Sequence, residues 1–142
     1  MRTLHVGLRV EGLERSLAFY TGLGYEVVGQ VPETEFGSLT MLKLPGDEFV
    51  TIELVHDPDG GPVEPGGLNH LVIQVESMQD TVTALTARGL QVEAPGSPDG
   101  SEDFRTAWVT DPDGYRIELV QWSAGHPEGM TRDDFGGEVA RE

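Results

Sequence analysis

The sequence contains an internal repeat with a fixed offset of 65 residues. Each copy carries one histidine followed 48 residues later by one glutamate, and both glutamates lie in the same tetrapeptide, Ile-Glu-Leu-Val. The pairs are His5 with Glu53 and His70 with Glu118. Glutamate, threonine, glycine and valine positions between these points keep the same offset without a gap, and Leu13 corresponds to Met78. A chain that repeats in this way is expected to fold as two similar halves that pack together, each presenting one imidazole and one carboxylate.

The length of the chain favours one domain. At 142 residues it is long enough to bury a sizeable core. The spacing of the repeat indicates two half-domains rather than two independent domains. We therefore expect a single domain over residues 1–122, with module 1 at 1–56 and module 2 at 68–122. Residues 123–142 have little apolar periodicity and are expected to form a C-terminal tail, which is either loose or an arm over a partner.

Composition excludes several classes of function. The net charge of −16 disfavours nucleic acid, because a negative surface repels phosphate backbones. Cysteine is absent, which removes disulfides, thiolate metal ligands and cysteine nucleophiles. No apolar run approaches the roughly 18 residues that a membrane span needs, and no secretory leader is visible. The sequence thus predicts a cytoplasmic protein with no membrane partner.

The pattern of apolar residues predicts the order β-α-β-β-β in each copy. In the first, a helix face of Leu13, Leu17 and Tyr20 follows the first strand and is ended by glycines. The predicted strands of the first copy are 3–10, 25–31, 38–44 and 49–56. The second copy has a capping residue, Ser77, before its helix, and Gly89 is a plausible C′ residue. The predicted strands of the second copy are 68–75, 90–93, 103–110 and 115–122, the last two joined by a turn at 111–114.

The four repeated polar residues are candidate metal ligands. Side chains alternate across a strand, so each histidine shares a face with residues two and four positions on. Both glutamates lie between Ile and Leu in mid-strand, where a carboxylate is costly unless a cation or another partner compensates it. Taken singly, each residue is more often a surface or hydrogen-bonded group. Their joint recurrence favours a site with two imidazole and two carboxylate ligands, converging where the copies pack. Without sulfur ligands, zinc, nickel, cobalt, iron and manganese all remain candidates. Positions on the metal that are filled by water rather than by protein would be open to a substrate.

Four segments together resemble the vicinal oxygen chelate superfamily, and within it bacterial glyoxalase I, or lactoylglutathione lyase. They are LHVGLRVEGLERSLAFYTGLG at 4–24, IELV at 52–55, LNHLVIQV at 68–75 and DPDGYRIELVQ at 111–121. The resemblance implies an α+β fold, in which two tandem βαβββ modules form a curved mixed sheet around a metal. It also implies a homodimer with sites built from both subunits.

The family's ligand order, His, Glu, His, Glu, is filled here by His5, Glu53, His70 and Glu118. Ring-cleaving dioxygenases of the superfamily use two His and one Glu, and the epimerases usually have Gln at the place of Glu53. The order therefore favours glyoxalase I. The resemblance implies one divalent metal ion per site, with nickel or cobalt favoured and zinc as a further candidate.

The activity implied is methylglyoxal detoxification, in which a 2-oxoaldehyde–thiol hemithioacetal becomes a 2-hydroxyacyl thioester through a metal-stabilised enediolate. The metal acts as a Lewis acid, and a glutamate transfers the proton from C1 to C2. We expect Glu118 to be this base, with Glu53 as its pseudo-symmetric counterpart.

The expected contacts to the thiol depart from the family. Arg9 matches an arginine that contacts the glutathione carboxylate, and it lies on the His5 face. Asp57 replaces an asparagine, and the loop at 97–103 is acidic where the family has lysine and glycine. An anionic thiol would be repelled there, so the thiol stays open.

Two alternatives remain. The chain is either a protein that sequesters an antibiotic without chemistry, or a related metalloenzyme with another small oxygenated substrate, such as an epimerase or a natural-product tailoring enzyme. The presence of all four ligands counts against sequestration, whereas the acidic loop keeps the other-substrate alternative open.

Overall fold

The order of helices and strands follows the repeat. The structure is a computed structural model that describes residues 1–136. Its elements are β1 (Val6–Arg9), α1 (Leu13–Leu23), β2 (Glu26–Thr34), β3 (Gly37–Lys43), β4 (Ile52–His56), β5 (Leu71–Gln74), α2 (Met78–Ala87), β6 (Arg105–Thr110), β7 (Arg116–Gln121) and a 3-10 helix, Arg132–Phe135. The predicted tail falls partly on residues 137–142, which lie outside the described residues.

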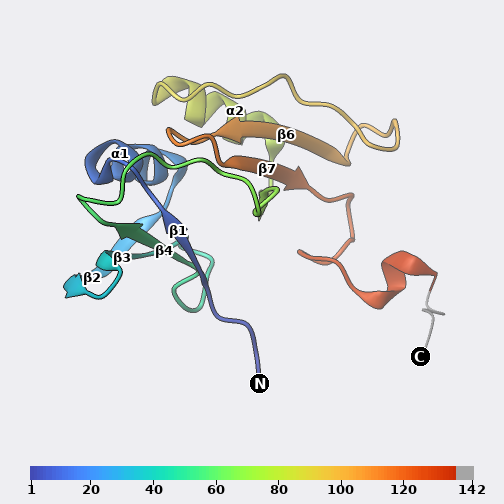
Figure 1. Ribbon diagram of the computed structural model, residues 1–142. Helices are drawn as coiled ribbons and strands as arrows, with labels where there is room; N and C mark the ends of the chain where they lie inside the picture. The colour runs from blue at the N-terminus through green and yellow to red at the C-terminus, as the bar shows by residue number, and fades with distance from the viewer. Residues whose placement is uncertain (137–142) are drawn as a thin grey trace.

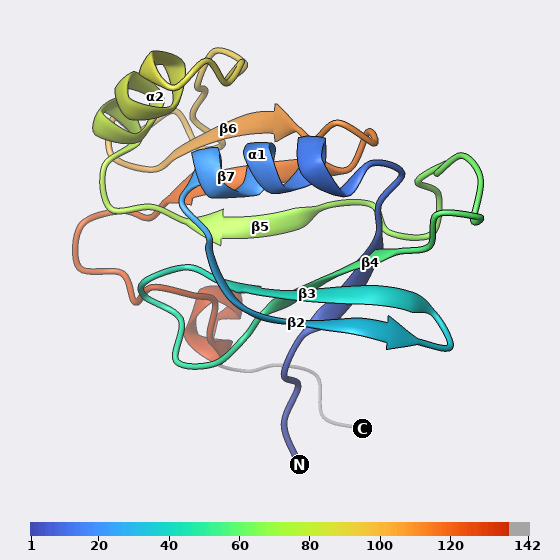
Figure 2. The same ribbon diagram turned by 90° about the vertical axis from the view of Figure 1, so that its left-hand side faces the viewer.

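Each half of the chain forms its own mixed sheet. The first has the strand order β1-β4-β3-β2 and the second the order β5-β7-β6. In the first sheet, β4 pairs parallel with β1 and antiparallel with β3. In the second, β7 pairs in the same way with β5 and β6. Figures 1 and 2 show the two sheets, with α2 beside β6. The α+β fold class is confirmed, although the described chain has two sheets where the resemblance implies one curved sheet.

Both helices end as their sequences predict. Gly24 follows α1 with a φ of 126°, a conformation that disfavours residues with a Cβ. The Ser77 side chain accepts a hydrogen bond from the backbone N–H of Asp80 at the start of α2, and Gly89 follows the helix with a φ of 87°. Within the described residues, neither helix is long and apolar enough to cross a bilayer.

The prediction of a short strand at 90–93 is wrong. This segment does run along the outer edge of β6, where Glu93 N–H donates to the Trp108 carbonyl at 2.9 Å and Gly96 exchanges two hydrogen bonds with Thr106. Pro95 lies between these contacts and has no N–H to donate. The bonds are therefore too sparse to form a continuous ladder.

One hydrophobic core is shared by both halves. Its largest fully buried apolar side chains come from helices and strands of each: Tyr20, Leu42, Leu54, Leu85, Ile117, Val109 and Leu119. In β4 and β7 the buried residues alternate with the glutamates. The shared core therefore lies on one face of each sheet, and the glutamates lie on the opposite face, which we call the open face.

The turn at 111–114, in the second half, is hydrogen-bonded to α1 of the first half. Asp111 accepts a hydrogen bond from the buried hydroxyl of Tyr20 in α1, with the oxygens 2.8 Å apart. Asp113 accepts from the Arg15 guanidinium at 2.9 Å. Burial, and next the charge of Asp111, raise the pKa of Tyr20 above its ordinary value, so the phenol stays the donor. The turn that the sequence predicts is confirmed, and its carboxylates also bind the first half.

Replacing Tyr20 with Phe removes the hydroxyl that binds Asp111. Hydrogen bonds to charged groups contribute about 1–3 kcal/mol, so we expect the free energy of unfolding to fall by about that amount. The measurement is urea denaturation, and Tyr25→Phe is the matched control. Tyr25 is a buried tyrosine whose hydroxyl makes no hydrogen bond within residues 1–136. Equal losses in the two variants would contradict the role of the Tyr20–Asp111 bond.

Candidate metal-binding site

The first half brings His5 and Glu53 together. His5 immediately precedes β1, and the parallel pairing of β1 with β4 aligns Gly7 with Glu53. The Nε2 atom of His5 lies 3.1 Å from the Oε2 atom of Glu53. The side chains are 35% and 16% exposed, so they stand on the open face rather than in the core. We call this pair the first half-site.

The second half repeats the arrangement with His70 and Glu118. His70 immediately precedes β5, and the pairing of β5 with β7 aligns Val72 with Glu118. The Nε2 atom of His70 lies 3.7 Å from the Oε1 atom of Glu118, and the side chains are 34% and 23% exposed. Trp108 and the His70 ring pack edge to face, with the ring centroids 5.2 Å apart. We call His70 and Glu118 the second half-site.

The two half-sites do not meet within one chain. In residues 1–136 no group of three or more His, Cys, Asp or Glu side chains is placed to hold a metal ion. The expectation that all four ligands converge where the halves of one chain pack is therefore wrong. The reason is the shared core, which takes the inner face of both sheets and leaves the glutamates on the open faces.

Each half-site supplies two donors that divalent metals accept. An imidazole nitrogen and a carboxylate oxygen lie 3.1 Å apart in one pair and 3.7 Å apart in the other, both on partly exposed side chains. These donor types suit zinc, nickel, cobalt, iron and manganese. Two ligands are too few for a protein metal centre, so each half-site fits one half of a four-ligand site.

Arg9 lies on the open face of β1, as predicted, but its guanidinium is engaged. Its Nη2 donates to the carbonyl oxygen of Gly60 at 3.0 Å. A Cβ at Gly60 would lie 2.7 Å from the same nitrogen. The arginine therefore packs directly on the backbone of the linker between the halves, and a ligand carboxylate would compete with the Gly60 carbonyl.

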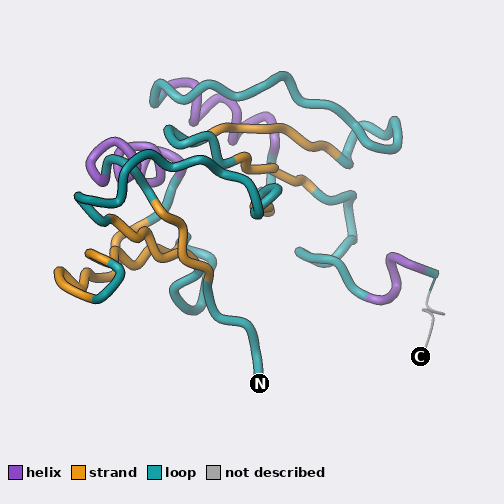
Figure 3. Tube along the Cα trace, viewed as in Figure 1, coloured by secondary structure: helices purple, strands orange, loops and turns teal. Residues whose placement is uncertain are grey.

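Aromatic residues at the end of the second sheet are covered by the tail. Trp122 stacks between Phe104 and His126, with ring centroids 5.4 Å and 4.4 Å away. The indole N–H donates to the Glu128 carbonyl at 3.1 Å. Figure 3 shows the tail as mostly loop with one helical turn. The sequence had no signal for this packing, because the tail lacks apolar periodicity.

The acidic loop at 97–103 is held in an ionised form. Hydrogen bonds from Ser101 lower the pKa of Asp99, and a hydrogen bond from the Ala124 N–H lowers the pKa of Asp103. Asp103 in this way also ties the loop to the start of the tail. The loop is therefore negative at neutral pH, as its composition indicates.

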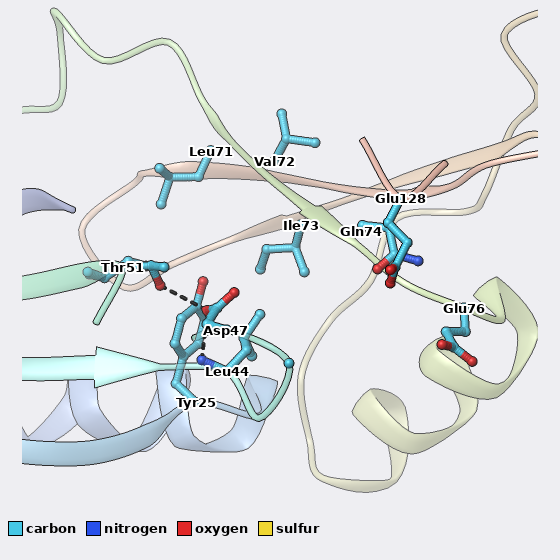
Figure 4. Close-up of a pocket in the computed structure, with 12 residues that line it drawn as sticks. Tyr25, Leu44, Asp47, Thr51, Leu71, Val72, Ile73, Gln74, Glu76 and Glu128 are labelled. Atoms are coloured by element: carbon cyan, nitrogen blue, oxygen red, sulfur yellow. Dashed lines mark hydrogen bonds between the residues drawn. The ribbon is translucent and has the colours of Figure 1, made fainter. Parts of the chain in front are cut away.

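A cavity of about 460 Å³ lies between the halves. Figure 4 shows Tyr25, Asp47 and Thr51 of the first half on one side, and β5 with Glu128 on the other. Neither His–Glu pair lines it, although Val72 does and follows His70 by two residues. The cavity therefore adjoins the second half-site without containing its ligands, and the sequence did not predict it.

Comparison with known proteins gives one family match over most of the chain. Residues 2–119 match the family described as Glyoxalase/Bleomycin resistance protein/Dioxygenase superfamily. A Vibrio cholerae protein named "Probable lactoylglutathione lyase" is 34% identical over 129 residues, which are 88% of this chain and 94% of that protein. An Arabidopsis thaliana protein, "Probable lactoylglutathione lyase, chloroplastic", is 31% identical over 84% of this chain, which spans only 35% of that relative.

Solved structures of the same fold include both enzymes and a binding protein. A mutant of glyoxalase I from Zea mays superposes with a TM-score of 0.73 at 25% identity, covering 86% of this chain and 45% of that one. TnmS3, titled an antibiotic binding protein from Streptomyces, superposes with a TM-score of 0.68 at 23% identity, covering 87% of this chain and 98% of that one. The second likeness concerns the fold alone.

The ion pair between His126 and Asp134, both in the tail, is expected to depend on pH. The hydrogen bond to Asp134, followed by that to the Pro127 carbonyl, raises the pKa of His126 above its usual value of 6.5. Because the folded pKa is raised, the contribution of the ion pair is complete below the unfolded pKa and is lost as pH rises through the folded pKa. An NMR titration of His126 should give a pKa above 6.5, and Asp134→Asn should lower it. An unchanged pKa in that variant would contradict the pair.

Proposed function

The chain belongs to the Glyoxalase/Bleomycin resistance protein/Dioxygenase superfamily, and we propose that it is a metal-dependent lyase of the glyoxalase I type. Its reaction would convert a 2-oxoaldehyde–thiol hemithioacetal into a 2-hydroxyacyl thioester. The observation that carries the proposal is the matched His–Glu pair on the open face of each half. The names of bacterial relatives, identical at 31–34%, support the same activity.

The complete site is proposed to form between two chains. The first half-site of one chain would face the second half-site of its partner, giving two sites per homodimer. In support, the two pairs stay separate within one chain, and apolar residues beside them are exposed. Leu4 is 55% exposed, Val6 39% and Val72 55%. β1 and β5 are also edge strands whose outer sides are unpaired within residues 1–136. A partner chain would cover this apolar surface and these edges.

Four side chains would hold one divalent ion at each site: His5, Glu53, His70 and Glu118. Nickel or cobalt is favoured, and zinc also suits this ligand set. When bound, the ion would supply Lewis-acid polarisation of the two vicinal oxygens of the substrate.

Glu118 is proposed as the group that moves the proton. Its carboxylate would accept the C1 proton as the C1–H bond breaks, and then return that proton to C2. Glu118 lies 3.7 Å from His70, whereas Glu53 is hydrogen-bonded to His5 at 3.1 Å. The looser carboxylate is better suited to accept and release a proton, with Glu53 as its counterpart. The indole of Trp108, paired with Glu118 across β6 and β7, would restrict the access of water.

The thiol part of the substrate is proposed to differ from glutathione. Glutathione carries a net negative charge, and the loop at 97–103 presents ionised carboxylates. Arg9 would first have to leave the Gly60 carbonyl to bind a ligand carboxylate. This departure also favours the second candidate function, a metalloenzyme of the same family with another small oxygenated substrate.

Substituting Gln for Glu118 tests the assignment of the base. General-base catalysis contributes roughly 10²–10⁴-fold, so the variant should lose at least that much turnover of a methylglyoxal–thiol hemithioacetal. Its circular dichroism should stay unchanged, because Glu118 lies on the open face. Glu26→Gln makes the same change at an exposed strand position far along the chain from the half-sites and should keep full activity. Full activity of Glu118→Gln would contradict the assignment of Glu118 as the general base.

Removing His5 tests the ligand set independently of turnover. After dialysis, the metal content of His5→Ala should be lower than that of the parent protein by roughly tenfold or more. Loss of a group that supports a metal ligand already lowers metal affinity by roughly 10–100-fold, and loss of the ligand itself should lower it by at least as much. His56→Ala is the control, since His56 ends β4 on the opposite face from Glu53. Metal content is measured by elemental analysis, and equal content in the two variants would refute His5 as a ligand.

A further inference from the structure

The two half-sites differ at the residue before each histidine. Asn69 precedes His70, and Leu4 occupies the matching place before His5 at the repeat offset of 65. The Oδ1 atom of Asn69 lies 2.6 Å from the Nδ1 atom of His70. A leucine side chain has no acceptor to offer, and within residues 1–136 the Nδ1 atom of His5 makes no hydrogen bond. Within the described part of the chain, the second half-site therefore has a hydrogen-bond partner for the Nδ1 atom of its imidazole and the first half-site has none.

The chemistry of that contact selects one tautomer of His70. An amide oxygen accepts hydrogen bonds and cannot donate them. The hydrogen in the short contact must therefore reside on Nδ1 of the imidazole. A neutral ring protonated at Nδ1 carries its lone pair on Nε2. This nitrogen is the one that faces Glu118.

The distances within the half-sites agree with this difference. In the first, the separation of 3.1 Å between His5 Nε2 and Glu53 Oε2 is that of a hydrogen bond, so a proton lies between them. In the second, His70 Nε2 and Glu118 Oε1 are 3.7 Å apart, which is too long for a hydrogen bond. No proton then bridges the two atoms, and a lone pair remains on each. Such an arrangement favours a cation.

Aromatic packing holds the plane of the His70 ring. Trp108 meets it edge to face, at an interplanar angle of 74°. The guanidinium of Arg116 lies over the Trp108 ring, 4.8 Å from its centroid, and is ion-paired with Glu93. The imidazole is thus contacted by Asn69 at one nitrogen and by Trp108 in an edge-to-face packing of the two rings. Among the described residues 1–136, His5 has neither kind of support.

We propose that Asn69 is a positioning residue that fixes His70 as the Nδ1–H tautomer, so that the second half-site is preorganised for a divalent cation. The proposal rests on the proposed function for the identity of His70 as a ligand. It assigns no contact between Asn69 and the metal or the substrate. Supporting groups of this kind typically change metal affinity by roughly 10–100-fold when removed.

Three substitutions at the matching positions test the proposal. Asn69→Leu gives the second half the residue of the first, Asn69→Asp keeps an oxygen acceptor, and Leu4→Asn is the reciprocal change. Both positions are exposed, so the variants should fold, and circular dichroism checks this. The tautomer of His70 is read in metal-free protein by long-range ¹H–¹⁵N NMR at about pH 8.5, where imidazole is ordinarily neutral. The affinity for zinc ion is measured by competition with a chromophoric chelator.

The expected results separate positioning from simple stability. The parent protein and Asn69→Asp should have His70 protonated at Nδ1. Asn69→Leu should lose that preference and bind zinc roughly 10–100-fold more weakly, whereas Leu4→Asn should leave the tautomer of His70 unchanged. A parent His70 protonated at Nε2, or unchanged tautomer and affinity in Asn69→Leu, would overturn the proposal.

The same experiment distinguishes failure of the proposal from failure of the proposed function. If the parent protein binds no zinc, the proposed metal site fails, yet the NMR measurement on metal-free protein still decides whether Asn69 sets the tautomer. If zinc binding is weakened in Asn69→Leu but the parent turns over no hemithioacetal, the inference about Asn69 is supported and the proposed lyase function is contradicted.

Discussion

The parallel pairing of the first strand of each half with the last strand of that half determines where the two His–Glu pairs lie. This register aligns Gly7 with Glu53 and Val72 with Glu118. A histidine two residues before the aligned position then reaches the same carboxylate, since side chains on one face of a strand recur every second residue. A shift by one residue would turn both glutamates into the core. The His–Glu pairs are thus a direct consequence of strand register.

The shared core explains why the pairs remain apart. Apolar residues of both halves pack into one cluster, and the turn at 111–114 binds α1 through Tyr20 and Arg15. Each sheet therefore presents its inner face to the same core and its glutamate to the outside. A four-ligand site then requires another surface with the complementary pair, and a second copy of the chain has it. The asymmetry at Asn69 and Leu4 means that the two contributions to such a site need not be equivalent.

The repeat predicted much of this arrangement, because it fixed both the strand order and the side of each strand that carries a polar exception. Ser77, Gly24 and Gly89 correctly marked helix ends, and the turn at 111–114 was predicted by its Pro and Gly content. The prediction of a strand at 90–93 was wrong because Pro95 has no N–H to continue the hydrogen bonds to β6, which the apolar residues of the segment do not reveal. The separation of the half-sites could not be read from spacing, since spacing does not say which faces pack together. The tail packs on Trp122 through His126, while Phe104 stacks on the same indole, and the apolar pattern of the tail does not encode this packing.

The most direct test of the central claim is complementation between two disabled chains. One chain carries His5→Ala with Glu53→Gln, and the other carries His70→Ala with Glu118→Gln, so neither alone can form a four-ligand site. If sites form between chains, each mixed dimer regains one intact site, and co-expressed protein should bind metal and turn over substrate where the separate variants do neither. If the mixture binds no more metal than the separate variants, although mixed dimers are present by mass spectrometry, the account of a site shared between two chains is contradicted.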